Sequence, residues 1–109
     1  MLITIALGAL AAAAQPYGPD TCLTGFVWRE ATDGDHVCVT PSVREQARRD
    51  NAQAKYRISV SNSTYGPDTC RSGYVWREAT DGDHVCVLPS VRDETRADNA
   101  AAPTRYVNQ

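Results

Sequence analysis

Cys22, His36 and Cys38 lie near one another in the sequence, with Asp33 and Asp35 beside them. Thiolates, imidazoles and carboxylates are the usual ligands of zinc, so this set is a candidate metal site. The same two cysteines can instead form a disulfide. Structural zinc sites usually place two residues between paired cysteines, and that spacing is absent here. The sequence therefore favours the disulfide and keeps zinc as the alternative.

His36 also follows Asp35, and a hairpin around this point would bring Glu30 onto the facing strand. A histidine between carboxylates can act as a general acid or base. There is no nucleophile motif such as Gly-x-Ser-x-Gly beside it. Small-molecule sites are usually clefts of roughly several hundred Å³, and units this small rarely enclose such a cleft. We therefore expect a protein that is not an enzyme and that uses no cofactor.

The tripeptide Trp28-Arg29-Glu30 indicates binding rather than catalysis. Trp and Arg are frequent at the energetic centres of interfaces, and an exposed Trp offers a flat amphipathic ring for stacking on a sugar. The alternative is that Trp28 forms the apolar core of its own unit. The candidate binding residues of the whole chain are Arg29, Glu30, His36, Arg77, Glu78 and His84. The expected partner is an extracellular protein or a glycan.

All of these residues belong to a segment that occurs twice. The 28 residues 17–44 return as residues 65–92, and only four positions differ: Leu23/Arg71, Thr24/Ser72, Phe26/Tyr74 and Thr40/Leu88. Each copy holds two cysteines, so a unit that was duplicated whole must close its own bridge. This predicts Cys22–Cys38 and Cys70–Cys86 among the three possible connectivities. Each bridge closes a loop worth roughly 3 kcal/mol of stability.

Strand and turn signals organise each copy. Residues 26–31 and 36–40 are rich in aromatic and β-branched side chains, which predicts two strands. Asp33-Gly34 between them predicts a type I′ hairpin turn, in which both central residues have positive φ. In that register Trp28 faces Val39. The buried face would then hold Phe26, Trp28, Val37 and Val39.

A helix is expected after each hairpin. Ser42 with Glu45 fits a capping box, and Ser90 with Asp93 has the same arrangement. The residues that follow are polar and rich in alanine, which favours a helix without a strong apolar stripe. We therefore expect each helix to rest lightly on its hairpin.

These elements predict an α+β fold of two small repeat units, each a disulfide-tied β-hairpin followed by an α-helix. Units of about 45 residues bury too little apolar surface to fold on a core alone. Whether the two units pack together is left open. The expected organisation is a signal peptide (1–14), repeat unit 1 (15–57), a Ser-rich linker (58–64), repeat unit 2 (65–103) and a disordered tail (104–109).

The first residues and the overall charge bear on localisation. Residues 2–14 are uncharged and almost wholly apolar, too short to span a bilayer but typical of the apolar part of a signal peptide. No basic residue follows Met1, which departs from that pattern. An even number of cysteines agrees with secretion. The net charge of −2, from 11 basic and 13 acidic residues, argues against binding to nucleic acids or anionic membranes.

The repeated motif resembles a short repeat found in secreted bacterial proteins. It reads Gly-Pro-Asp-Thr-Cys-x-x-Gly-Phe/Tyr-Val-Trp-Arg-Glu-Ala, then Gly-Asp-His-Val-Cys-Val, then Pro-x-x-Arg, with Asp50-Asn51 and Asp98-Asn99 following. The resemblance implies an extracellular tandem-repeat protein, and it supplies no biochemical role and no catalytic residues. The sequence thus predicts a secreted, non-enzymatic binding or interaction module. A zinc protein and a purely structural extracellular spacer are the alternatives.

Overall fold

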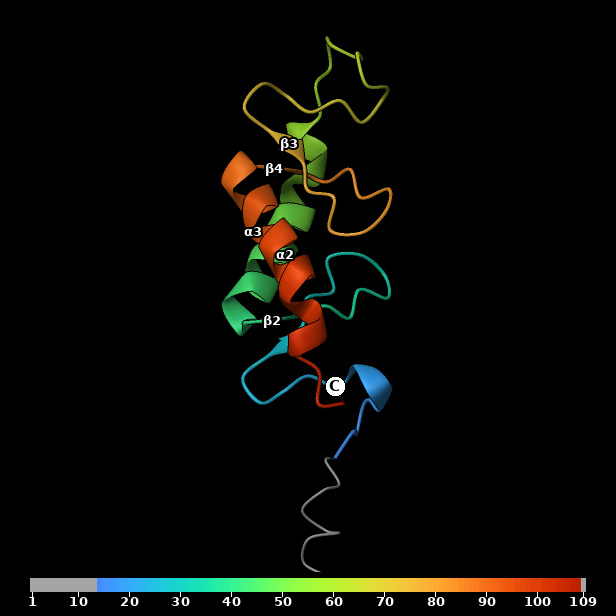
Figure 1. Cartoon of the computed structure of the whole chain (residues 1–109). Helices are drawn as coiled ribbons and strands as arrows, with labels where there is room; N and C mark the ends of the chain where they lie inside the picture. Colours follow the sequence, from blue (N-terminus) through green and yellow to red (C-terminus); the bar gives the residue numbers. More distant parts are fainter. Residues whose placement is uncertain (1–13, 109) are drawn as a thin grey trace, which may run out of the picture.

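The computed structural model describes residues 14–108, and its elements follow the duplication of the sequence (Figure 1). Each half contains a two-stranded antiparallel hairpin followed by an α-helix, so the fold is α+β as predicted. The predicted signal peptide lies outside the described residues except for Ala14. The elements are η1 (Gly18–Asp20), β1 (Val27–Trp28), β2 (Cys38–Val39), α2 (Pro41–Gln53), η2 (Ala54–Arg57), β3 (Val75–Trp76), β4 (Cys86–Val87), α3 (Pro89–Ala101) and η3 (Ala102–Thr104).

The predicted disulfides are confirmed. Cys22 is bonded to Cys38 and Cys70 to Cys86, with a Cα–Cα distance of 5.7 Å in each pair. Each bridge ties the loop that enters the hairpin to the second strand. Cys38 and Cys86 are fully buried, whereas Cys22 and Cys70 are partly buried, so each bridge connects the interior of its unit to the surface.

The predicted hairpin register is wrong by one residue. Trp28 pairs with Cys38 instead of Val39, and Val27 pairs with Val39. Because side chains alternate along a strand, a shift of one residue exchanges the two faces. Of the four residues expected on the buried face, only Val39 is buried, whereas Arg29 from the opposite face is 2% exposed.

The turn explains the shift. The backbone N–H of Asp35 donates to the carbonyl of Thr32 at 3.1 Å, so Asp33 and Gly34 are its central residues. Only Gly34 has a positive φ, of 78°, whereas a type I′ turn needs positive φ at both positions. The side chain of Asp35 also accepts the backbone N–H of Ala31 at 3.0 Å and that of Val37 at 3.3 Å. These bonds hold a longer loop than the predicted two-residue turn.

The helices begin two residues earlier than the predicted capping boxes require. Thr40 and Leu88 occupy the N-cap positions, and neither makes a side-chain capping bond. Pro41 and Pro89 are the first helical residues, a position that suits proline because its missing N–H has no intrahelical partner there. Ser42 therefore lies inside the helix, and the predicted capping box does not form.

The segments expected to be a linker and a disordered tail both take part in the fold. Ile58 forms an antiparallel bridge with Cys70, and Tyr106 forms the equivalent bridge with Cys22. Each hairpin is thus bordered by the residues that follow the helix of the other unit. Four backbone hydrogen bonds of 2.8–2.9 Å hold the two bridges: Ser59 N to Thr69 O, Arg71 N to Arg57 O, Val107 N to Thr21 O and Leu23 N to Arg105 O.

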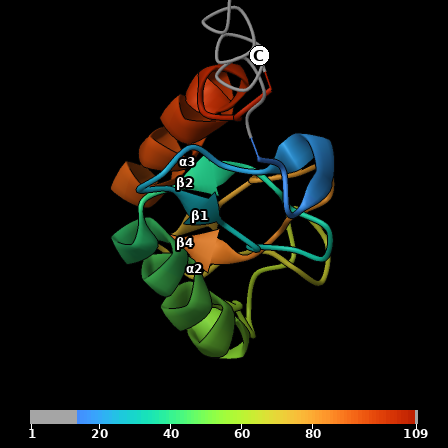
Figure 2. The ribbon, with the colours of Figure 1, turned by 90° about the horizontal axis from the view of Figure 1, so that it is seen from below.

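The two units therefore pack together, and the region between them is largely polar. Figure 2 shows α2 and α3 on one side of the hairpins and the long loops on the other. The largest fully buried side chains are Arg29 and Arg77. Within residues 14–108, the buried apolar residues are all small: Ala31, Cys38, Val39, Ala47, Ala79, Cys86, Val87 and Ala102. With so little apolar core, the fold depends on its disulfides and on the polar contacts between units.

Candidate functional site

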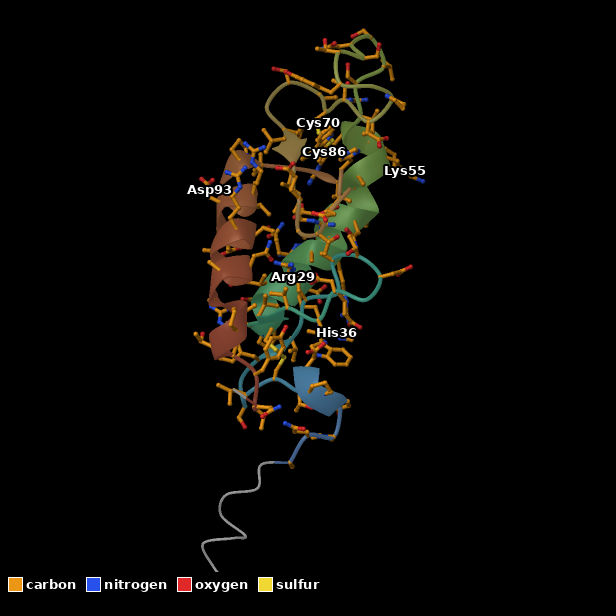
Figure 3. The ribbon with its side chains drawn as sticks, turned by 45° about the vertical axis from the view of Figure 1, so that its right-hand side comes forward. Arg29, His36, Lys55, Cys70, Cys86 and Asp93 are labelled. Atoms are coloured by element: carbon orange, nitrogen blue, oxygen red, sulfur yellow. A yellow bond between two sulfur atoms is a disulfide. The ribbon has the colours of Figure 1, made fainter. Side chains whose placement is uncertain are left out.

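The two arginines predicted to bind a ligand are buried in ion pairs. Nε of Arg29 donates to Asp35 Oδ2 at 2.7 Å and Nη2 donates to Oδ1 at 3.1 Å, a bidentate arrangement. Nη2 also donates to the carbonyl of Ala79 in the other unit at 3.3 Å. Arg77 repeats these contacts with Asp83 and with the carbonyl of Ala31. Figure 3 shows Arg29 in the middle of the molecule, where it connects the units.

The two histidines brace the tryptophans. The ring of His36 stacks on that of Trp28, with a centroid distance of 3.7 Å and an interplanar angle of 15°. Nδ1 of His36 lies 3.1 Å from Oδ2 of Asp20, and the Trp28 Nε1–H donates to the carbonyl of Asp20 at 2.8 Å. His84, Trp76 and Asp68 repeat this arrangement. The histidines thus fix the orientation of two tryptophans that are only partly buried.

The two glutamates are exposed and have an unusual backbone conformation. Glu30 has a φ of 53° and Glu78 a φ of 56°, in the left-handed region that residues with a side chain seldom adopt. Such a conformation costs on the order of 1 kcal/mol, and strained residues often cluster at functional sites. The carboxylate of Glu30 lies 3.9 Å from Arg44, whereas that of Glu78 lies 3.7 Å from Arg96.

Each glutamate borders a surface cleft beside the tryptophan of its unit. The first cleft has a volume of about 430 Å³ and the second about 330 Å³, which lies in the range of small-ligand sites. The first cleft is lined by Tyr17, Thr21, Cys22, Phe26, Val27, Trp28, Glu30 and Arg44. The second is lined by the eight equivalent residues, Tyr65, Thr69, Cys70, Tyr74, Val75, Trp76, Glu78 and Arg92, and in addition by Asn62.

The clefts lie at opposite ends of the molecule. In Figure 1 the loop that enters the first hairpin (blue to cyan) is at one end and that of the second (yellow) is at the other. Tyr17 and Tyr65 form the outer walls with exposures of 70% and 72%. The Tyr17 ring meets that of Trp28 edge to face, with a centroid distance of 5.8 Å.

The structure thus divides the six predicted binding residues into three pairs. Glu30 and Glu78 line the clefts, the histidines support the tryptophans from behind, and the arginines are buried. The tyrosines and the helix arginines Arg44 and Arg92 were not predicted as binding residues from the sequence. All of them lie within the duplicated segment, but so do the residues with purely structural roles, so the duplication alone could not separate them.

The zinc alternative loses its thiolate ligands. Cys22 and Cys38 are bonded to each other, as are Cys70 and Cys86, so none of them can bind a metal as a thiolate. Within residues 14–108, no group of three or more His, Cys, Asp or Glu side chains is placed to hold a metal ion. The arrangement of the clefts is suited to binding an organic ligand through aromatic rings, one carboxylate and one guanidinium group.

The described residues contain no helix that is both long and apolar enough to cross a membrane. Comparisons of the chain with models of protein families, with curated proteins and with solved structures found no match. The geometry of the two clefts therefore carries the functional argument.

Proposed function

We propose that this protein is a secreted, non-enzymatic binding module with two matching glycan sites, one in each repeat. The observation that carries the proposal is the pair of clefts, which share eight equivalent lining positions and differ at only one of them, Phe26/Tyr74. A bare spacer has no need for two such clefts. Two sites at opposite ends also allow one molecule to hold two points of a polymer, which raises avidity.

The lining chemistry favours a neutral sugar. The faces of a sugar ring carry C–H groups that pack against aromatic rings. Each of the two clefts is lined by a Tyr and a Trp. A carboxylate accepts hydrogen bonds from hydroxyl groups, and a guanidinium donates to them. Glu30 and Arg44 supply one charge of each sign in the first cleft, so the site favours a ligand without net charge.

The same chemistry supports binding without hydrolysis. Most glycosidases use two carboxyl groups on either side of the scissile bond. The first cleft has one carboxylate among its described lining residues, Glu30, and this group lies 3.9 Å from Arg44. The two disulfides support an extracellular location, because such bonds persist in oxidising compartments.

Intrinsic fluorescence provides the first test. The chain has two tryptophans, and each lines one cleft. Titration with neutral oligosaccharides, such as cellohexaose and chitohexaose, is expected to change their emission in a saturable way. A proline-rich peptide serves as the rival ligand, because such peptides also dock on aromatic grooves. A response to the peptide and to neither sugar would replace the glycan by a protein partner.

Tyrosine variants provide the second test. Tyr17→Ala and Tyr65→Ala each remove one exposed cleft wall, so the fold is expected to persist. On soluble sugar, each variant should keep half of the sites. On insoluble polysaccharide, each should lose far more than half of its affinity, because avidity is commonly worth about 100-fold or more. The matched control is Tyr56→Ala, which removes a tyrosine that is 58% exposed and outside both clefts. Undiminished binding by the double variant would contradict the proposal.

A further inference from the structure

We infer that one repeat unit recognises a second copy of the same unit, and that this association needs no covalent connection between the two. The inference concerns the contact between the units and stands independently of the proposed glycan sites. Its partner is a copy of the repeat, whether it lies in the same chain or in another.

The contact between the units is reciprocal, as in a two-fold symmetric dimer, where residue i meets j and j meets i. Arg29 donates to the carbonyl of Ala79, and Arg77 donates to that of Ala31. Thr32 meets its own equivalent, Thr80, with 2.9 Å between the hydroxyl oxygens. A residue can contact its own equivalent only on the symmetry axis, so the axis runs between these two turns.

The segments after the helices extend the reciprocity. Nη1 of Arg57 donates to Asp50 of its own helix at 2.9 Å and to the carbonyl of Cys86 in the other unit at 3.0 Å. Nη1 of Arg105 makes the same bonds, to Asp98 and to the carbonyl of Cys38. Each unit thus uses its own arginine to complete the hairpin of the other.

The residues that make these contacts are compatible with self-pairing. Arginine, alanine, threonine and cysteine occupy identical positions in both units. One substituted contact position is Phe26/Tyr74, whose ring lies below an arginine in both units, at 4.8 Å from Arg105 and 4.9 Å from Arg57. Another is Ile58/Tyr106, where both residues form a bridge to the other unit but only Tyr106 adds a side-chain hydrogen bond. Two copies of either unit can therefore form the same arginine, alanine and threonine contacts.

The connection between the units adds little to this interface. Val60 is 94% exposed, and residues 61–64 are exposed as well. The side-chain hydrogen bonds of this stretch are local, from the N–H groups of Ser61 and Asn62 to Ser59 and from Thr64 to Asn62. Both disulfides lie within a unit, so no covalent bond other than the chain itself joins the halves.

A protease site inserted after Val60 in the full chain tests the inference. After cleavage, the halves are expected to elute together at micromolar concentration with the mass and circular dichroism of the uncut protein. Under denaturing, non-reducing conditions they should separate. Halves that elute apart under native conditions would overturn the inference, whether or not each remains folded.

A variant pair shows whether the described contact holds the halves. Thr32→Lys places a charge against Thr80 on the axis, whereas Thr24→Lys places the same charge at an exposed threonine of the same unit. The nicked Thr32→Lys protein is expected to dissociate at least tenfold more readily than nicked wild type, and nicked Thr24→Lys should match wild type. Equal dissociation of the two variants would show that another surface holds the halves and would overturn the inference.

Self-pairing is measured on the separated halves. After removal of its partner, each half is expected to form a dimer by light scattering. The second half should pair several-fold more tightly than the first, because Tyr106 donates a hydrogen bond to the carbonyl of His36 across the contact and Ile58 has no hydroxyl. Halves that remain monomeric, although the nicked pair holds together, would contradict recognition of like by like.

Discussion

Within the 28-residue duplicated segment, the two repeats agree closely in the buried centre and differ at exposed positions and in the clefts. The buried Arg29–Asp35 pair and its copy Arg77–Asp83 share distances of 2.7 Å and 3.1 Å. The clefts differ more, with volumes of about 430 Å³ and 330 Å³. Of the four substitutions within the 28-residue segment, three fall on exposed positions in both copies, and the fourth, Phe26/Tyr74, lines the clefts.

The difference reflects what each region must satisfy. At the centre, each buried arginine is paired with an aspartate of its own unit and also donates to a carbonyl of the other unit, because an unpaired buried charge is costly. A change in one unit there also disturbs the other. At the outer ends, solvent satisfies the polar groups, and a ring of similar shape can replace another. The centre therefore constrains the fold, whereas the residues at the outer ends are free to vary.

The largest expected effect comes from the central arginines. Arg29→Met leaves Asp35 buried without its cation, and loss of one partner of a buried pair typically costs about 3–5 kcal/mol. Arg77→Met is expected to cost the same, because its contacts are equivalent. Urea denaturation measures the free energy of unfolding of both variants. The control is Arg48→Met, because the side chain of Arg48 is 61% exposed. The stability of this control is expected to lie within about 0.5 kcal/mol of wild type. Unequal costs would show that the two halves of the centre are not equivalent.

Removal of one disulfide should destabilise both units. The variant with Cys22→Ala and Cys38→Ala is expected to lose roughly 3 kcal/mol. A further Trp28→Phe change in both the variant and its reference leaves Trp76, in the untouched unit, as the only tryptophan reporter. The unfolding transition reported by Trp76 should move to a lower urea concentration and reflect the whole loss of stability, because each unit makes hydrogen bonds that the other unit needs. A Trp76 transition that stays in place would mean that the units unfold independently.

A smaller effect distinguishes the two crossing segments. The Tyr106 hydroxyl donates to the carbonyl of His36 at 2.9 Å, and Ile58 is the equivalent residue in the first unit. Tyr106→Phe should cost about 1 kcal/mol, the typical net value of one hydrogen bond. Ile58→Tyr should stabilise the protein by a similar free energy, because the new hydroxyl can donate to the carbonyl of His84. Thermal unfolding of the two single variants and the double variant measures both, and a stabilising Tyr106→Phe change would contradict the assignment.

The smallest expected effect is a loss of stability at alkaline pH. It arises at one end of the molecule, because Tyr106 has a hydroxyl and its equivalent Ile58 has none. Burial, with the charges of Asp20 and Asp35, raises the pKa of Tyr106 above its ordinary value of 10.0. A raised pKa means that the folded state favours the neutral hydroxyl, so this stabilisation is present below pH 10 and is lost as pH rises through the folded pKa. Wild type should lose more stability than Tyr106→Phe over that window. A constant difference between them up to pH 12, about two units above the ordinary pKa, would contradict this.

Much of the local structure could be predicted because short-range signals determine it. The spacing of Cys22 and Cys38 within a duplicated unit allowed the bridges to be assigned, and the strand and turn residues placed the hairpin. Its register could not be predicted, because the buried side chain of Asp35 holds the loop and adds length to it. The predicted register placed Phe26 and Trp28 on the buried face of the hairpin, whereas the buried residue of this strand is Arg29.

Part of the candidate site was singled out from the sequence, but its arrangement was not. Trp28 and Glu30 were selected together with Arg29, yet the backbone sends the arginine inward and leaves the other two beside a cleft. The tyrosine wall and Arg44 come from a preceding loop and a following helix. Residues so separated in the chain share a site only after the hairpin and helix have packed.

By itself, the sequence determined the two units, their elements and their disulfides, because these follow from residue types and spacings within one repeat. Only the tertiary structure decided that the units pack as reciprocal partners and that the segments after α2 and α3 cross between them. The physical reason is that each buried arginine also donates to a carbonyl of the other unit and that the residues after the other unit's helix border each hairpin. The sequence of one repeat does not indicate that its contacts will come from a second copy of the repeat.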